Sequence, residues 1–236
     1  MKGPELRLRV QSMRRATPTT RIVRADLAGA RFTFEAGQAA LIGPALRSER
    51  VPYSIACAPE DTRESGTLEF LIRVESSGRW GHLFDDLARG MEIGLRGPYG
   101  SFVYSKQPRA RRLLFIAGGT GISPIRSMIR HALLTPEPAP VQLLYSARSA
   151  DELAYLPELR AMARQGDIQL RLHVTREAPP RWRGARGRIT RAELTPFVDD
   201  GSALCFVCGP AAMVHEVPLM LRELGVPRAQ IRVEEW

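Results

Sequence analysis

The stretch LLFIAGGTGISP, residues 113–124, decides how the second half of this chain folds. Its first five residues form a continuous apolar run, which is typical of a strand buried on both faces of a parallel sheet. A glycine-rich turn follows, and Ser123 and Pro124 suit the N-cap and the first position of a helix. Backbone N–H groups at such a turn can face an anion. Apolar residues then recur at helical spacing: Ile125, Met128, Ile129, Ala132 and Leu133.

The same alternation of strand and helix continues to the C-terminus. Residues 149–152 have the pattern of a capping box that opens a helix reaching Ala163. A last helix is predicted over residues 211–224, with a kink at Pro218. This order predicts a C-terminal α/β domain with a parallel sheet, residues 107–236. Its further strands are expected at residues 141–145, 168–174 and 203–207.

The first half of the chain, residues 1–106, has a different pattern. Short runs alternate apolar and polar residues with a period of two, and glycine-containing turns separate them. One helical stretch is expected near residues 83–87. The pattern predicts a small antiparallel barrel or sandwich. The expected strands include residues 6–10, 21–24, 31–34 and 68–74.

Composition excludes several classes of protein. With 44% apolar and 25% charged residues among 236, the chain reads as globular. No apolar run approaches the ~18 residues of a membrane span, and the N-terminus has no signal-peptide pattern, so we expect a cytoplasmic protein without a membrane partner. Three cysteines and four scattered histidines predict neither a disulfide framework, nor an iron–sulfur cluster, nor a metal site.

The formal net charge of +9 indicates an anionic partner. Basic residues are not interleaved with aromatic ones, so nucleic acid is not the expected partner.

The glycine loop has the pattern G-x-G-x-x-P and predicts dinucleotide binding, the alternative being a tight turn without a ligand. The next strand ends at Ser146 and Arg148 without a carboxylate, and the third ends at Thr175 and Arg176. Arginine there suits a 2′-phosphate, which favours NADPH, with NADH possible. Residues 171–191 hold seven arginines and one acid, which equally fits a solvated basic face.

Four motifs occur in an order that carries a family resemblance. They are PYS at residues 52–54, GPYG at 97–100, GGTGISP at 118–124 and CGP at 208–210. Together, over nearly the whole chain, they resemble the ferredoxin–NADP(+) reductase superfamily. The resemblance implies an N-terminal antiparallel Greek-key β-barrel that binds FAD and a C-terminal NAD(P)-binding domain. It also implies a flavin in the cleft between them and hydride exchange with a nicotinamide.

The resemblance also assigns roles to the flavin side of the site. Tyr53 matches the tyrosine that packs on the isoalloxazine ring, and Ser54 the hydroxyl near flavin N5. Trp236 is similar in position to a terminal aromatic stacked on the other flavin face. Tyr53 also fits a half-buried strand residue, and Trp236 a frayed terminus. The segment along the ribityl chain and pyrophosphate corresponds to Ile72, Arg73 and Val74.

For the nicotinamide nucleotide, Cys208 matches the cysteine beside the nicotinamide, although it equally fits a small buried strand residue. Glu234 matches the acid near the active site. Cys205 and Cys208 form a C-x-x-C, but their side chains on a strand face opposite ways, so no redox pair is expected. The remaining nucleotide-binding positions are Gly119, Thr120, Gly121, Pro124, Gly209 and Pro210.

Two positions depart from the family pattern. The usual R-x-Y-S is VPYS here, so Val51 replaces the arginine that clamps the FAD pyrophosphate, and Arg50 is displaced by one residue. Arg73 or Arg79 could substitute. Gly81 stands where a serine commonly binds the same phosphate. These departures leave open whether the bound flavin is FAD or FMN.

Three functions follow from these observations. The first is an FAD-dependent NAD(P)H oxidoreductase that passes electrons to a separate acidic chain, such as a ferredoxin, a flavodoxin or an oxygenase component. The second is an NAD(P)H:flavin reductase that releases free reduced flavin. The third, a catalytically silent relay subunit, would need a cysteine-ligated cluster, which three cysteines argue against.

Overall fold

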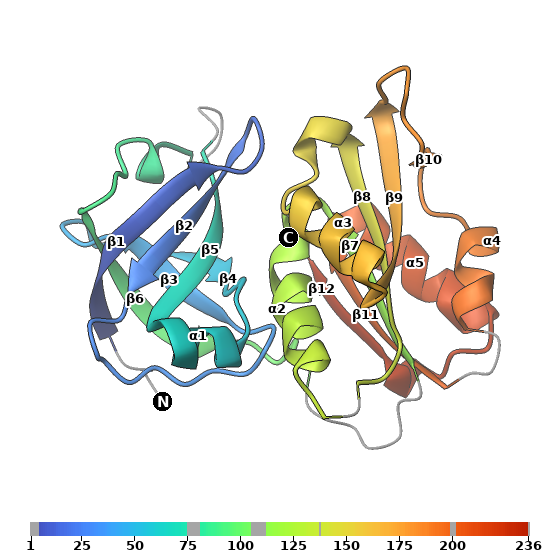
Figure 1. Ribbon diagram of the computed structural model, residues 1–236, viewed down its shortest axis with the longest axis horizontal. Helices are drawn as coiled ribbons and strands as arrows, with labels where there is room; N and C mark the ends of the chain where they lie inside the picture. The colour runs from blue at the N-terminus through green and yellow to red at the C-terminus, as the bar shows by residue number, and fades with distance from the viewer. Residues whose placement is uncertain (1–4, 75–80, 105–111, 137, 199–201, 236) are drawn as a thin grey trace. The chain divides into compact units, whose positions relative to one another are not determined.

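A computed structural model of the chain describes residues 5–74, 81–104, 112–136, 138–198 and 202–235. The chain divides into two compact units (Figure 1). The first consists of Met1–Ser105 with Arg126–His131, and the second of Lys106–Ile125 with Ala132–Trp236. The domain boundary predicted between residues 106 and 107 lies outside the described residues.

The first unit is a six-stranded antiparallel sheet in the order β4-β3-β6-β1-β2-β5. An isolated bridge between Ile55 and Phe70 joins the region after β4 to β5, so the sheet curls into a near-barrel. The expected antiparallel barrel is therefore confirmed. Its strands are β1 (Glu5–Arg15), β2 (Thr20–Asp26), β3 (Ala39–Pro44), β4 (Val51–Ser54), β5 (Thr67–Arg73) and β6 (Glu92–Tyr99).

The period-two pattern places one apolar face in the barrel core. In β1, Leu8 and Val10 are buried while Arg7 and Arg9 are exposed. The strand predicted at residues 31–34 is wrong: the segment is irregular, although Phe32 is buried in the same core. The side chains of residues 31–34 alternate between exposed and more buried positions, as in a strand, but the backbone does not pair with a neighbouring strand.

Two short helices complete this unit. The helix expected near residues 83–87 is a single 3₁₀ turn, η1 (Gly81–Phe84). Helix α1 (Pro59–Ser65) was not predicted, although it begins with proline and ends at Gly66 in the left-handed conformation. The backbone N–H of Ala58 donates to the Asp61 carboxylate at 2.8 Å, which caps its first turn.

The second unit is a six-stranded parallel sheet in the order β10-β9-β8-β7-β11-β12. This confirms the predicted α/β class. The strand β12 was not predicted; it pairs in parallel with β11 along its whole length. The strands are β7 (Arg112–Gly118), β8 (Val141–Ser149), β9 (Ile168–Glu177), β10 (Ala185–Arg186), β11 (Ala203–Gly209) and β12 (Ile231–Glu235).

The helices differ from the expectations in two places. Helix α2 begins at Ile122, so Ser123 is not its N-cap. The capping box predicted at residues 149–152 is wrong as well, because the Ser149 hydroxyl donates to the Asp151 carboxylate and the segment forms only a 3₁₀ turn, η3 (Ala150–Glu152). The α-helices are α2 (Ile122–Leu133), α3 (Leu156–Gln165), α4 (Arg191–Leu194) and α5 (Ala211–Glu223); the other 3₁₀ turns are η2 (Gly119–Gly121), η4 (Thr195–Phe197) and η5 (Arg228–Gln230).

The side chains of β7 and β11 divide between the two faces of this sheet. Leu114, Ile116 and Cys205 belong to a core cluster with Val217 and Leu221 of α5. Helix α5 continues through Pro218, and the predicted kink there stays a prediction.

Within the described residues, no helix is long and apolar enough to cross a membrane. In the same ranges, no three histidine, cysteine or acidic side chains lie close enough together to hold a metal ion.

Candidate functional site

Ser54 lies at the end of β4 and carries a buried hydroxyl. The residue is 2% exposed, and its Oγ has no hydrogen-bond partner among the residues that the structure describes. A buried polar group left unpaired costs about 1–3 kcal/mol. A ligand acceptor, such as a flavin ring nitrogen, would satisfy this hydroxyl, so Ser54 fits the group that the resemblance predicts.

Tyr53, next to Ser54, is brought together with Arg73 of β5. The half-buried Tyr53 ring packs edge-on against Phe84, with ring centroids 5.6 Å apart. Burial raises the pKa of Tyr53, and a hydrogen bond from the Arg73 backbone and the Arg73 charge only partly oppose it. The phenol therefore stays neutral near pH 7. Tyr53 of β4 and Arg73 of β5, both predicted to contact the flavin, thus lie next to each other.

The neighbours of Arg73 on β5 have mainly structural surroundings. Ile72 is completely buried in the barrel core, so its side chain is not available to a ligand and only its backbone is. Val74 packs against the same core, and its N–H donates to Thr19 at 2.9 Å. Gly81 begins η1. The predicted positions Arg79 and Trp236 lie outside the described residues.

Arg50 does not replace the missing phosphate clamp. Its Nη1 donates to the carbonyl oxygens of Arg47 at 2.6 Å, Glu49 at 3.0 Å and Pro44 at 3.3 Å. Its guanidinium also lies against Gly94, where a Cβ would come within 2.1 Å of Nη2. The charge of Arg50 thus stabilises the turn before β4.

The glycines of the loop between β7 and α2 serve two purposes. A Cβ on Gly121 would lie 2.4 Å from the Cys208 carbonyl oxygen, and one on Gly118 would lie 2.7 Å from Pro210 Cδ. These two positions allow the loop to pack closely against the end of β11. Gly119 has φ +55° and open space around its Cα, which suits an exposed turn that an anion can approach. Thr120 is half-buried beside it, and Pro124 is buried in the first turn of α2.

Tyr145 of β8 holds this loop, a role that the sequence did not reveal. Its hydroxyl donates to the Gly119 carbonyl at 3.1 Å and accepts from the Ala154 N–H at 3.0 Å. The side chain is completely buried, and that burial strongly raises its pKa. A tyrosine at the end of the predicted strand 141–145 was the available signal, because a buried tyrosine hydroxyl needs a partner.

Arg148 and Arg176 come together at the carboxyl ends of β8 and β9. Ala147 pairs with Val174 and Ser149 with Glu177, so a bulge sets Thr175 and Arg176 against the single residue Arg148. Both arginine side chains are exposed. Thr175 donates its hydroxyl to the Ala147 carbonyl at 3.3 Å.

The fourth predicted position at these strand ends, Ser146, is buried and pairs with Gly118 and with His173.

Cys208 and Glu234 are neighbours across β11 and β12. They are register partners, and Cys208 pairs on its other side with Ala117 of β7. Paired residues of parallel strands share a face, so the thiol and the carboxylate lie on the same side of the sheet. Cys208 is buried and not part of a disulfide, and Glu234 is partly exposed. Gly209 packs against Gly118, and Pro210 precedes α5.

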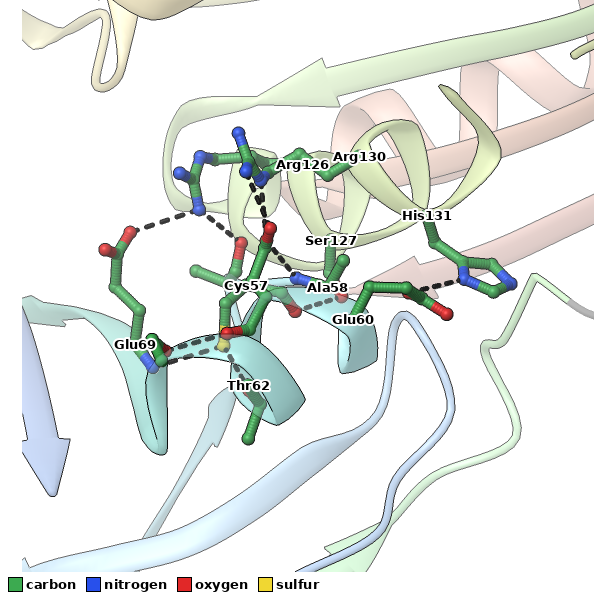
Figure 2. Close-up of polar contacts among 12 residues, drawn as sticks. Cys57, Ala58, Glu60, Thr62, Glu69, Arg126, Ser127, Arg130 and His131 are labelled. Carbon is green, nitrogen blue, oxygen red and sulfur yellow. Dashed lines mark hydrogen bonds and ion pairs between the residues drawn. The ribbon is translucent and has the colours of Figure 1, made fainter. Parts of the chain in front are cut away.

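Helix α2 carries a polar cluster that no sequence motif predicted (Figure 2). Arg126 Nη1 donates to the Ala56 carbonyl at 2.6 Å and lies 3.1 Å from Glu69 Oε1. Ser127 Oγ donates to the Cys57 carbonyl at 2.6 Å. These contacts fix residues 126–131 within the first unit.

Two ion pairs extend the cluster along the same helix. Arg130 donates through two nitrogens to both oxygens of Asp61, at 2.6 and 2.7 Å. His131 Nδ1 lies 2.9 Å from Glu60 Oε2. Burial raises the pKa of each carboxyl, but the hydrogen bonds and positive charges of their partners outweigh it, so both pKa values are lowered.

Two family profiles match the chain. Residues 7–104 match the Oxidoreductase FAD-binding domain, and residues 115–218 match the Oxidoreductase NAD-binding domain. The chain is 34% identical over 223 residues to Ferredoxin--NADP reductase B of Sorangium cellulosum (strain So ce56), which covers 90% of this chain and 88% of that protein. It is 30% identical over 235 residues to the reductase component of propane 2-monooxygenase of Rhodococcus jostii (strain RHA1), covering 97% of this chain and 62% of the relative.

Solved structures have the same fold. A cytochrome P450 reductase of Amycolatopsis superposes with a TM-score of 0.84 at 25% identity, covering 99% of this chain and 70% of the other. A ferredoxin NADP+ reductase from Neisseria gonorrhoeae, solved with bound FAD and NADP, superposes with a TM-score of 0.79 at 21% identity, covering 98% of each chain. The chain therefore belongs to the ferredoxin–NADP(+) reductase superfamily and is an FAD- and NAD(P)-binding oxidoreductase.

Proposed function

We propose that this enzyme transfers hydride from NAD(P)H to FAD and passes the electrons to a separate electron-transfer protein or oxygenase component. The observation that carries the proposal is the 34% identity with Ferredoxin--NADP reductase B over 90% of the chain. The similarity to a monooxygenase reductase component supports the wider choice of acceptor.

In this proposal residues 1–106 provide the flavin site. A bound flavin supplies the chemistry, since it accepts two electrons as hydride and releases them one or two at a time. The Ser54 hydroxyl donates a hydrogen bond to the ring, and Tyr53 packs on one ring face. Arg73 contributes its charge to the pyrophosphate. The Gly81 N–H and the backbone of residues 72–74 are the further contacts, and the family resemblance assigns the second ring face to Trp236.

Residues 107–236 bind the nicotinamide nucleotide in the same proposal. The backbone of Gly119, Thr120 and Gly121 faces the pyrophosphate, at the start of α2. Cys208, with Gly209 and Pro210, lies beside the nicotinamide, and Glu234 is the nearby acid. The protein's main contribution to rate is the alignment of the two rings.

We also propose a preference for NADPH. The exposed Arg148 and Arg176 oppose each other at the ends of β8 and β9, and a guanidinium pair suits a 2′-phosphate. Ser146 and Thr175 complete this end of the site.

The acceptor should be an acidic protein. The net charge of +9 favours encounter with a negatively charged partner, because such attraction speeds association.

A second candidate is an NAD(P)H:flavin reductase that releases reduced flavin. Val51 replaces the usual arginine, and the Arg50 guanidinium donates to three backbone carbonyls. The FAD pyrophosphate would therefore bind one arginine fewer. Looser flavin binding is the expected consequence.

Purification followed by steady-state kinetics separates the two candidates. Yellow protein that retains FAD through gel filtration and reduces an added ferredoxin with NADPH supports the first. Colourless protein that oxidises NADPH only when free flavin is added supports the second. Protein that neither binds flavin nor oxidises NAD(P)H contradicts both.

A further inference from the structure

A pocket of about 500 Å³ lies in the second unit between α3 and the segment that follows β9. Leu170 and Leu172 line it; they are two residues apart on β9 and therefore project from the same face of that strand. None of the residues to which we assign a role in hydride transfer or nucleotide binding lines this pocket.

Trp182 forms a fixed wall of the pocket. Its Nε1 donates to the Ala185 carbonyl at 3.0 Å, which sets the orientation of the indole. Gly184 makes room for the ring, because a Cβ there would lie 2.6 Å from Trp182 Cζ2 and 2.6 Å from the Leu172 carbonyl. The indole and the two leucines thus present a preformed apolar surface.

Three arginines surround that surface. Arg160 and Arg164 are one helical turn apart on α3, and Arg183 follows Trp182. All three are exposed, and none has a hydrogen-bond or ion-pair partner among the residues described by the structure. No acidic side chain of the described ranges lines the pocket. Three unneutralised guanidiniums beside an apolar wall would be satisfied by an anion.

The pocket is separate from the proposed 2′-phosphate position. Leu172 is four residues before Arg176 on β9, a distance of about 13 Å along an extended strand. Helix α3 runs back toward the start of β9, so Arg160 and Arg164 lie away from the strand ends where the nucleotide is expected.

We propose that this pocket binds a small organic anion with a flat apolar body. The apolar part would lie against Trp182 and the leucines, and its carboxylate, sulfonate or phosphate would meet the arginines. The volume is within the ~300–1,000 Å³ usual for small-molecule sites. A bare inorganic anion would leave the apolar surface uncovered.

Titration of the purified holoenzyme with 2-naphthoate, followed by calorimetry, tests the proposal. We expect one saturable site per chain with a Kd of about 1 mM or tighter, as is usual for so small a ligand. Arg164→Gln and Arg160→Gln should each weaken binding roughly tenfold, because each removes a charged hydrogen-bond donor. Ala163→Leu should block the site without altering any charge, since Ala163 also lines the pocket.

Controls distinguish this site from general attraction to a basic protein. Arg222→Gln removes an equal charge from the exposed surface of α5 and should leave the affinity unchanged. Neutral 2-naphthylmethanol and inorganic phosphate should each bind at least roughly tenfold more weakly than 2-naphthoate.

The proposal would be overturned if 2-naphthoate showed no saturable binding, or if Arg222→Gln weakened its binding as much as Arg164→Gln does. It would also be overturned if inorganic phosphate bound as tightly as 2-naphthoate. A fourth contrary result is that NADPH displaces 2-naphthoate from the native protein but not from Arg176→Ala, because the pocket would then be part of the nucleotide site.

Discussion

Arg126 Nη1 lies 3.1 Å from Glu69 Oε1, and the two side chains are only 6% and 4% exposed. The pair is separated by 57 positions in the sequence and joins α2 to β5. A buried charge of this kind is tolerated because each partner has further contacts: Arg126 donates to the Ala56 carbonyl, and Arg24 donates to Glu69 Oε2 at 2.7 Å.

Arg126→Met should lower the free energy of unfolding by about 3–5 kcal/mol, because it leaves Glu69 buried with one partner fewer. Arg188→Met is the matched control: it removes an ion pair with Glu216 in which the two side chains are 71% and 50% exposed, so its loss should cost about 1 kcal/mol or less. Urea denaturation followed by circular dichroism measures both. Equal losses in the two variants would contradict the assigned importance of burial.

Asp61 should contribute to acid sensitivity. Burial raises its pKa, but the Arg130 hydrogen bonds, the Ala58 N–H and the charges of Arg130 and Arg126 outweigh this and leave the pKa lowered. Its stabilising effect is therefore complete above the unfolded value of ~3.9 and is lost as the pH falls through the lower folded value.

Asp61→Asn should flatten the decrease in stability below about pH 4, measured as Tm against pH. Asp167→Asn, which removes an exposed carboxylate without an ion pair in the described part of the chain, should leave that slope unchanged. A slope that is the same in Asp61→Asn and the native protein would show that the Arg130 pair does not stabilise the fold.

Ser54→Ala should slow flavin reduction by roughly 10- to 100-fold while leaving the fold intact, because its Oγ bonds nothing within the described residues. Stopped-flow absorbance with excess NADPH measures the step. Ser127→Ala provides the contrast: its hydroxyl bonds the Cys57 carbonyl, so it should lose about 1 kcal/mol of stability. An unchanged reduction rate in Ser54→Ala would remove this residue from the site.

Arg176→Ala should weaken the binding of NADPH by roughly 10- to 100-fold and the binding of NADH by much less, because only NADPH carries the 2′-phosphate. The ratio of KM values for the two cofactors is the measurement. Arg148→Ala should change the ratio of KM values in the same direction, whereas Arg222→Ala, on α5, should leave the ratio unchanged. Equal losses for the two cofactors would refute the assignment.

Gly121→Ala should destabilise the protein by about 1–3 kcal/mol or more, because its Cβ would meet the Cys208 backbone at 2.4 Å. Gly119→Ala has space but a φ of +55°, so it should cost about 1 kcal/mol. Thermal unfolding of both variants tests the ranking. A smaller loss for Gly121→Ala would mean that the loop does not pack against β11 as described.

Much of the fold could be predicted because it depends on short-range patterns. The run at residues 113–117, its glycine turn and the helical spacing after it are local, and they indicated a parallel sheet correctly. Local patterns failed at Phe32, whose burial resembles that of a strand residue although no ladder forms, and at Ser149, whose hydroxyl bonds Asp151.

The sequence by itself determined the two kinds of sheet, the glycine loop and the family. These features depend on the periods of strands and helices and on a few ordered motifs, which involve residues close together in the chain. Only the tertiary structure decided that Gly121 is needed beside Cys208, that Arg50 is held by a turn, and that residues 126–131 pack with the first unit. Each of these depends on which distant backbone atoms come within a few ångströms, and no local spacing encodes that.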